Sequence, residues 1–187
     1  MAKVDFIREA EVKAKEIYHE FYDVDDAINQ KEFVTPLGDI AENLGVSAYV
    51  ISFDDELKDH VELAQYFKEQ EVEGFSIKGS NKIFVDDKPE TARQRFTVAH
   101  ELGHILLGHL EGEGLSVVFR DSGSSPKSND PNELSANAFA AELLMPEPVM
   151  KEAYKMTNSI ASLATIFGVT RKAVVLRVER LKELGVI

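Results

Sequence analysis

The chain has 187 residues, with 21 Lys or Arg against 33 Asp or Glu, so its formal net charge is −12. The absence of Cys excludes a disulfide framework, a thiol nucleophile and an iron–sulfur site, and leaves His, Asp, Glu and backbone oxygen as metal ligands. The 44% apolar content is that of a globular protein. Charges within the first ten residues argue against a signal peptide or membrane anchor, so a cytoplasmic location is expected.

The first half of the chain contains three predicted helical stretches. Apolar residues at spacings of three and four predict an amphipathic helix over residues 4–29. Thr35 before Pro36 indicates an N-cap and first helical turn, and Gly45 a helix end. Residues 54–67 are also expected to be helical.

Three short segments predict a small sheet. Residues 46–53 are rich in β-branched and aromatic side chains, which favours a strand. Residues 74–78 and 82–86 flank a short glycine-containing link and predict a β-hairpin.

The second half reads as helical throughout. Residues 91–107 predict a helix ended by Gly108, and the polar, Gly/Ser-rich segment 120–130 predicts a mobile loop. Further helices are expected over residues 131–144, 147–156, 159–167 and 170–184. The predicted class is α+β: a small antiparallel or mixed sheet packed on the helix 91–107, then a helical C-terminal half.

Three of the five histidines lie within ten residues, and two of them form the motif His100-Glu-Leu-Gly-His104. Four residues advance an α-helix by about one turn, so both imidazoles project from one face and can bind one zinc ion. Glu101 lies beside that face, where a carboxylate can take a proton from the attacking water. The alternative is a pair of buried histidines satisfied by hydrogen bonds.

A catalytic zinc site usually has three protein ligands, so a third must be found. The longer motif with a third histidine is absent, since Leu107 and Leu110 occupy its positions. If the helix continued, His109 would lie on the face opposite His100. It would then be a poor metal ligand, but it could contact one of the metal-binding residues or the substrate. The remaining candidates are carboxylates: Glu111, Glu113, Asp121, Asp130, Glu133 and Glu142.

Two long motifs resemble the ImmA/IrrE metallopeptidases. The first extends from Arg95 to His109 around the HExxH residues, and the second is Glu133-Leu-Ser-Ala-Asn-Ala-Phe-Ala-Ala-Glu-Leu-Leu-Met-Pro146. The resemblance implies that Glu133 is the third metal ligand, beside His100 and His104. It also implies an acidic residue where this chain has Ser135. The similarity covers about residues 35–187.

The residues around Glu133 allow two interpretations on their own. Asp130-Pro-Asn-Glu133 has the spacing of a capping box, in which Glu133 would fold back onto its own helix. In the other, Glu133 and Asn137 share an inward face, and Asn137 could contact a metal ligand or the substrate. Glu142 lies on the opposite face and is expected to be solvated.

The C-terminal residues have the spacing of a helix-turn-helix, with Ala164, Gly168, Thr170 and Val174 at the positions that shape the turn. Residues 158–187 hold five basic and two acidic side chains, net +3, so residues 1–157 carry −15. This charge distribution argues against direct DNA binding by the whole chain. The resemblance to the ImmA/IrrE metallopeptidases implies that the segment packs beside the peptidase core, in a scaffold or substrate-docking role. The expected division is a helical extension over 1–30, a metallopeptidase core over 31–157 and this segment over 158–187.

The leading hypothesis is a zinc-dependent endopeptidase with Glu101 as general base. Family resemblance implies a protein substrate, a helix-turn-helix transcriptional repressor of a phage or mobile element, whose cleavage derepresses genes. The alternative is a non-catalytic repressor- or DNA-binding module with a structural metal. His109, Tyr154 and Arg95 are candidates for stabilising negative charge in the transition state, and the sequence does not choose among them.

Overall fold

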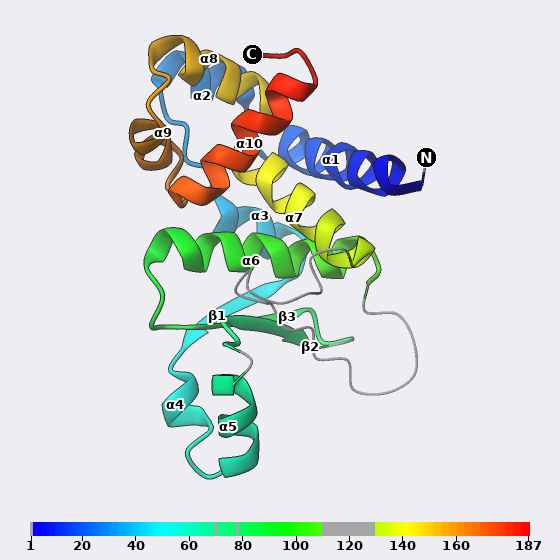
Figure 1. Cartoon of the computed structure of the whole chain (residues 1–187), viewed down its shortest axis with the longest axis vertical. Coiled ribbons are helices and arrows are strands. Elements are labelled where there is room, and N and C mark those ends of the chain that lie inside the picture. Colours follow the sequence, from blue (N-terminus) through cyan, green and yellow to red (C-terminus); the bar gives the residue numbers. More distant parts are fainter. Residues whose placement is uncertain (1, 70, 78, 110–129) are drawn as a thin grey trace.

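The computed structural model describes residues 2–69, 71–77, 79–109 and 130–187. A three-stranded sheet is covered on one face by a helix and then by a layer of further helices (Figure 1). The strand order is β1-β3-β2, with β1 (Ser47–Ile51) parallel and β2 (Gly74–Ile77) antiparallel to the central β3 (Lys82–Asp86). The α+β class and the predicted hairpin are confirmed.

The helix that carries the histidines, α6 (Thr91–Leu106), lies between the sheet and α7 (Pro131–Leu144). Gly103 of α6 allows this contact, because a Cβ there would lie 3.1 Å from Cδ1 of Phe139 and 3.3 Å from Cα of Ala136. The glycine within the histidine motif therefore permits a close approach of the two helices that carry the candidate ligands.

The predicted single helix over residues 4–29 is wrong, because the chain forms α1 (Ala2–Phe21) and α2 (Val24–Gln30). Asp23 separates them as the N-cap of α2, accepting a hydrogen bond from the Asp26 N–H at 2.9 Å. Helix α1 packs along α7, and its residues belong to the same buried core as the C-terminal helices. The proposed boundary near residue 30 stays a prediction.

Helix α3 (Leu37–Asn43) begins one residue later than predicted, with Pro36 rather than Thr35 at the N-cap position. The Thr35 side chain is fully buried and its hydroxyl donates to the carbonyl of Leu143, at 3.0 Å. Thr35 therefore binds the C-terminal end of α7, which the local sequence does not reveal.

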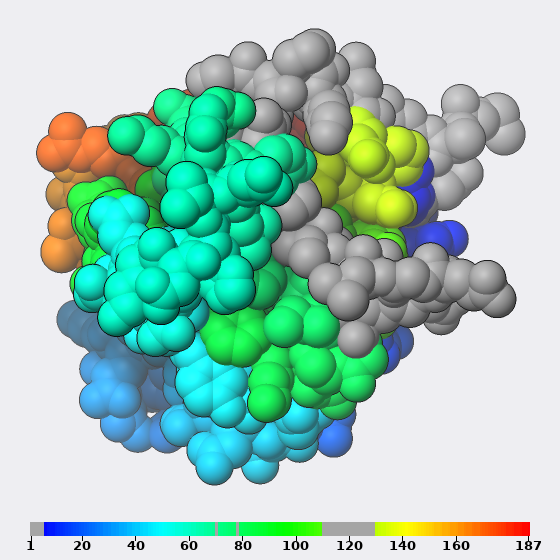
Figure 2. Space-filling view, turned by 90° about the horizontal axis from the view of Figure 1, so that it is seen from below, coloured from blue at the N-terminus to red at the C-terminus, as the bar shows by residue number. Residues whose placement is uncertain are grey.

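The predicted helix over residues 54–67 is also divided, into α4 (Phe53–Glu56) and α5 (Val61–Glu69). The Phe53 and Phe67 rings pack edge to face with centroids 5.4 Å apart, which folds α5 back beside α4. With Val72 they form a small core of their own. In the space-filling view these helices form the cyan-to-teal lobe in the foreground (Figure 2).

The C-terminal half contains the predicted helices α8 (Glu147–Met156), α9 (Ile160–Phe167) and α10 (Arg171–Glu183). Gly168 ends α9 with φ 61°, a left-handed conformation that favours glycine. Thr170 caps α10 by accepting a hydrogen bond from the Ala173 N–H at 3.2 Å. The predicted helix-turn-helix-like end is thus present, and α10 crosses over α7 (Figure 1).

Glu142 is not solvated, contrary to the prediction. It is 1% exposed and accepts a hydrogen bond from Arg177 of α10 at 2.7 Å, while Arg177 also donates to the carbonyl of Met145 at 3.0 Å. The face of α7 opposite Glu133 is covered by α10, and periodicity on α7 alone could not show this.

The predicted loop 120–130 lies outside the described residues except for Asp130. Among the helices that the structure describes, none combines the length and apolar character needed to span a membrane.

Candidate metal centre

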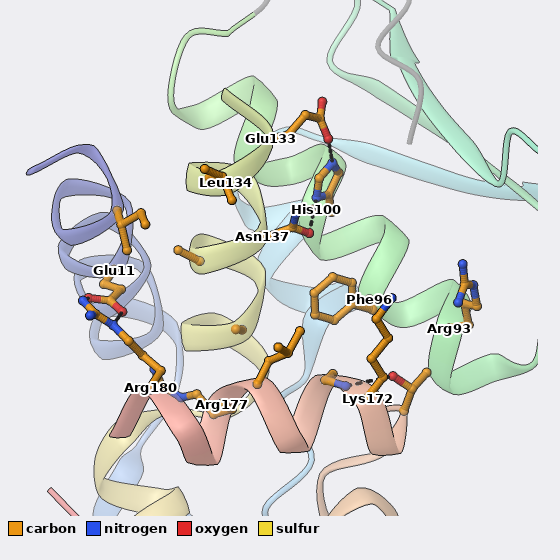
Figure 3. A pocket seen from close by; sticks show the side chains of 16 residues that line it. Glu11, Arg93, Phe96, His100, Glu133, Leu134, Asn137, Lys172, Arg177 and Arg180 are labelled. Carbon is orange, nitrogen blue, oxygen red and sulfur yellow. Dashed lines mark hydrogen bonds and ion pairs between the residues drawn. The ribbon is translucent and has the colours of Figure 1, made fainter. Parts of the chain in front are cut away.

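His100, His104 and Glu133 form one compact group, with one potential ligand atom of each lying within 4.8 Å of the others. The Nε2 atoms of the two histidines are 3.0 Å apart, and each lies 3.3 Å from an oxygen of Glu133. Figure 3 shows the contact between His100 and Glu133. Both imidazoles are buried and Glu133 is 23% exposed. Two neutral nitrogens and a carboxylate are a donor set that suits zinc.

Two helices position these three side chains. The histidines lie one turn apart on α6, and Glu133 is in the first turn of α7. The start of α7 is capped by Asp130, which accepts a hydrogen bond from the Asn132 N–H at 2.9 Å. Of the two interpretations left open for Glu133, the structure therefore favours the inward-pointing one, since its carboxylate lies against the histidines.

The electrostatics of Glu133 favour its charged form. Burial alone would raise its pKa, but the electrostatic contacts of its oxygens with the His100 and His104 imidazoles, 3.3 Å away, outweigh this and hold the pKa well below its usual range. Glu133 is therefore a carboxylate at neutral pH, the form that binds a metal ion.

His100 is oriented by Asn137, one turn after Glu133 on α7. Its Nδ1 lies 3.1 Å from the Asn137 amide oxygen, which can only accept a hydrogen bond. Nδ1 therefore carries the hydrogen and Nε2 presents its lone pair towards the group. A partner of this kind fixes the tautomer of a metal-binding histidine.

His104 is oriented by His109, which is in turn held by Ser135. Its Nδ1 lies 3.0 Å from Nδ1 of His109, whose Nε2 lies 3.2 Å from the hydroxyl oxygen of Ser135. That hydroxyl donates to the carbonyl of Pro131 at 2.8 Å, so its oxygen accepts from His109. His109 Nδ1 is then the acceptor for His104, which again leaves Nε2 of His104 to the metal group.

The helix does not continue to His109, so the condition under which this residue would lie on the opposite face of α6 is not met. Helix α6 ends at Leu106, and Gly108 turns the chain back with φ 73°. Burial first, and then the nearby His104, lowers the pKa of His109 to about 4, so its ring is neutral at pH 7. A neutral imidazole has one donor and one acceptor nitrogen, as the chain to Ser135 requires.

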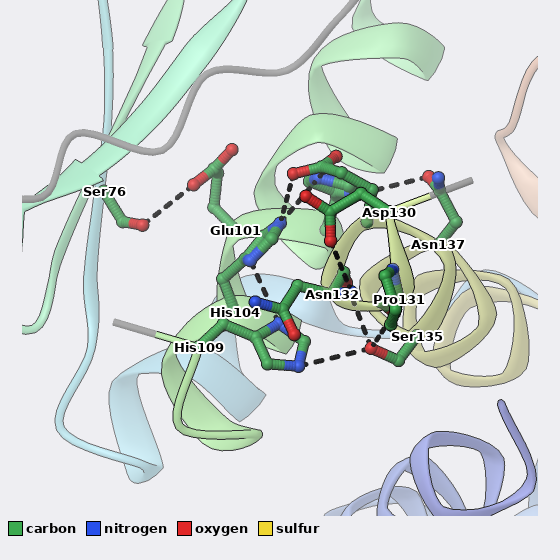
Figure 4. Close-up of polar contacts among 11 residues, drawn as sticks. Ser76, Glu101, His104, His109, Asp130, Pro131, Asn132, Ser135 and Asn137 are labelled. Atoms are coloured by element: carbon green, nitrogen blue, oxygen red, sulfur yellow. Dashed lines mark hydrogen bonds and ion pairs between the residues drawn. The ribbon is translucent and has the colours of Figure 1, made fainter. Parts of the chain in front are cut away.

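Glu101 is fully buried and points away from α7 towards the sheet (Figure 4). The hydroxyl of Ser76 in β2 donates to its Oε2 at 2.8 Å. The sequence interpretation missed Ser76, although alternation along β2 places it on the buried face. Glu101 is held beside the histidines without belonging to the metal group.

The other candidates occupy different places. Asp130 caps α7, Arg95 donates to the Thr35 carbonyl at 2.8 Å, and the Tyr154 ring lies 5.9 Å from the Lys182 ammonium. Glu111, Glu113 and Asp121 lie outside the described residues.

Comparison with known proteins agrees with this geometry. Residues 41–179 match the family model of the IrrE N-terminal-like domain, a peptidase family. A segment of 72 residues is 38% identical to the radiation response metalloprotease IrrE of Deinococcus radiodurans and covers 38% of this chain and 21% of that protein. The chain thus matches about a fifth of its relative's length. Because the family model spans most of the chain and its candidate metal group, the chain belongs to the family of IrrE N-terminal-like peptidase domains.

Proposed function

We propose that this chain is a zinc-dependent endopeptidase in which His100, His104 and Glu133 bind the metal. The observation that carries the proposal is the His–His–Glu group, with both imidazoles buried and the buried Glu101 side chain beside them (Figure 4). Bound there, zinc would polarise the scissile carbonyl and lower the pKa of the attacking water. Three protein ligands are the usual number at a catalytic zinc site.

Glu101 acts as the proton carrier in this proposal. The Ser76 hydroxyl holds one carboxylate oxygen at 2.8 Å, which fixes the orientation of the side chain. Glu101 takes a proton from the attacking water and delivers it to the leaving amine. Asn137 and His109 orient the two imidazoles and take no part in proton transfer.

For the substrate, we propose a helix-turn-helix transcriptional repressor of a phage or mobile element. This part rests on the resemblance of the motifs around His100 and Glu133 to the ImmA/IrrE metallopeptidases. Cleavage of the repressor would release the genes that it controls, and the proposed location is the cytoplasm.

The test is to replace Glu101 by Gln in the full chain. The variant should bind zinc as the wild type does but lose cleavage, by roughly 10²–10⁴-fold, because the general base is removed. Mass spectrometry of a candidate repressor incubated with each protein measures this. Glu62→Gln, at an exposed position in α5, is the matched control and should cleave normally.

Two outcomes would contradict the proposal. Undiminished cleavage by the Glu101→Gln variant would exclude Glu101 as the base. No cleavage by the wild type, together with unfolding on chelation, would instead indicate the alternative of a binding module with a structural metal.

A further inference from the structure

A groove leads from the metal centre between α6 and α7 to α10 (Figure 3). Its cavity of about 320 Å³ lies within the ~300–1,000 Å³ range of ligand pockets. His100 and Glu133 lie at one end and Lys172 of α10 lies at the other (Figure 3), and Leu176 of α10 also lines the groove. The groove therefore connects the proposed metal ligands with the second helix of the helix-turn-helix-like segment.

The length of the groove corresponds to a short stretch of peptide. On α7 its lining extends from Glu133 to Ala141, which at 1.5 Å per residue is about 12 Å. An extended peptide advances about 3.3 Å per residue, so roughly three or four residues span this length. A peptide with its scissile bond at the metal would bring its third or fourth residue to α10.

The walls of the groove are largely apolar. Phe96 of α6, Leu134 and Ala138 of α7, and Leu176 of α10 all line it. Leu176 is 57% exposed, although exposing a large apolar side chain to water costs free energy. A bulky apolar substrate side chain would cover it.

One cation at the α10 end of the groove, Lys172, has no counter-charge among the residues that the structure describes. Three of the four cations that line the groove are held by carboxylates: Arg93 by Glu73 at 2.5 Å, Arg177 by Glu142 at 2.7 Å and Arg180 by Glu11 at 2.8 Å. Lys172 is exposed, and within the described part of the chain it has no ion-pair partner. An ammonium without an ion-pair partner in the described ranges, beside an apolar wall, suits the carboxylate of a bound peptide.

We propose that α10 is the specificity element of this peptidase. It takes an acidic peptide segment in which an Asp or Glu, three or four residues from the scissile bond, pairs with Lys172 and a neighbouring apolar side chain covers Leu176. The assignment rests on the proposed peptidase function. A DNA-binding helix-turn-helix places its second helix in the major groove, but here that helix faces the metal centre, and the net charge of −12 repels DNA.

The first arm of the test measures cleavage. Metal-loaded full-length protein is incubated with randomised ten-residue peptides, and mass spectrometry locates each cleaved bond. Asp and Glu should be enriched at the third or fourth residue on one side of it. Lys172→Glu should lower cleavage of those peptides roughly three- to tenfold, as expected for an exposed ion pair turned repulsive, and should favour Lys or Arg instead.

Two matched controls accompany these variants. Lys151→Glu makes the same charge change at an exposed position of α8 outside the groove and should leave the preference unchanged. Leu176→Ala should reduce the preference for an apolar side chain, whereas Leu184→Ala, 49% exposed beyond the end of α10, should not.

The second arm measures binding alone. Immobilised, metal-loaded Glu101→Gln protein captures peptides from the same library, with and without Lys172→Glu. Capture of acidic peptides that the wild type fails to cleave would refute the peptidase function but support the groove as a binding site for acidic peptides. Cleavage with no acidic preference, or with a preference that Lys172→Glu leaves unchanged, would overturn the groove assignment. The assignment would also be overturned if the protein showed no peptide preference and instead bound duplex DNA in a salt-sensitive way that depended on Lys172.

Discussion

At the scale of single residues, the two imidazoles of the metal group are held by different kinds of partner. An amide oxygen of Asn137 orients His100, while a second imidazole, that of His109, orients His104 and is itself bound to Ser135. Ser135 stands where the resemblance implies an acidic residue. A neutral hydroxyl can serve because His109 is neutral and needs only an acceptor for its Nε2–H.

This arrangement predicts that His109→Phe weakens metal binding. The ring keeps its size but no longer accepts from His104 Nδ1, so the metal affinity should fall by roughly 10- to 100-fold. Competition with a chromophoric chelator measures the affinity. His60→Phe, at an exposed histidine, is the control and should bind metal normally. Wild-type affinity in His109→Phe would show that His104 does not depend on this contact.

At the scale of elements, the site depends on how closely α6 and α7 approach. The sequence predicted both helices, and the spacing of the histidines predicted that they share a face. The contact between the helices depends on Gly103 against Phe139 and Ala136, residues more than thirty positions apart. Since the ligands come from both helices, a change in their separation also changes the ligand geometry.

Gly103→Ala is therefore expected to destabilise the protein. The added methyl group would lie 3.1 Å from Phe139 Cδ1 and 3.3 Å from Ala136 Cα, so the helices must shift apart slightly, at a cost of up to about 3 kcal/mol against a helix-propensity gain of about 1 kcal/mol. Gly38→Ala in α3 is the matched control, since a Cβ there meets no atom within 4 Å, and should be neutral or stabilising. Urea unfolding measures both, and equal stability gains would contradict the close-contact argument.

The buried pair of Glu142 and Arg177 joins α7 to α10, with side chains 2% and 1% exposed. Arg177→Met should destabilise the fold by roughly 3–5 kcal/mol, because it leaves the Glu142 carboxylate buried without its partner. The double variant with Glu142→Leu should recover most of that loss.

Lys155→Met is the control for this pair, because Lys155 and Glu152 form a more exposed pair in α8. Its effect on the free energy of unfolding should stay within about 1 kcal/mol. Denaturant unfolding compares the three variants, and a small effect of Arg177→Met would show that the buried carboxylate is satisfied in another way.

At the scale of the whole molecule, the metal group lies where the sheet-covering helix α6 meets the helical layer. Helices α1 and α10 both pack on α7, so the N-terminal and C-terminal segments support the helix that carries Glu133. A bound metal ion would link α6 to α7 and thereby the two layers of the fold (Figure 1).

Zinc should consequently raise the melting temperature, and chelation should lower it. A ligand at 100 times its Kd stabilises the folded state by about 2.7 kcal/mol, provided the unfolded chain does not bind it. Differential scanning calorimetry with and without zinc measures the shift. Glu133→Gln should reduce it, and a zinc-independent melting temperature in the wild type would argue against this site.

The sequence by itself determined the α+β class, the hairpin, most helices and the pair of histidines, because periodicity and motif spacing are local properties of the chain. The residues around Glu133 did not decide whether it caps its own helix or binds the metal. The sequence-based predictions failed where a distant contact outweighed a local signal: the Thr35 hydroxyl donates to α7 instead of capping α3, and the contact of Phe53 with Phe67 folds α5 back beside α4. Tertiary structure also decided the places of Ser76, His109 and Glu142, since their partners lie on other segments and burial depends on what covers each face.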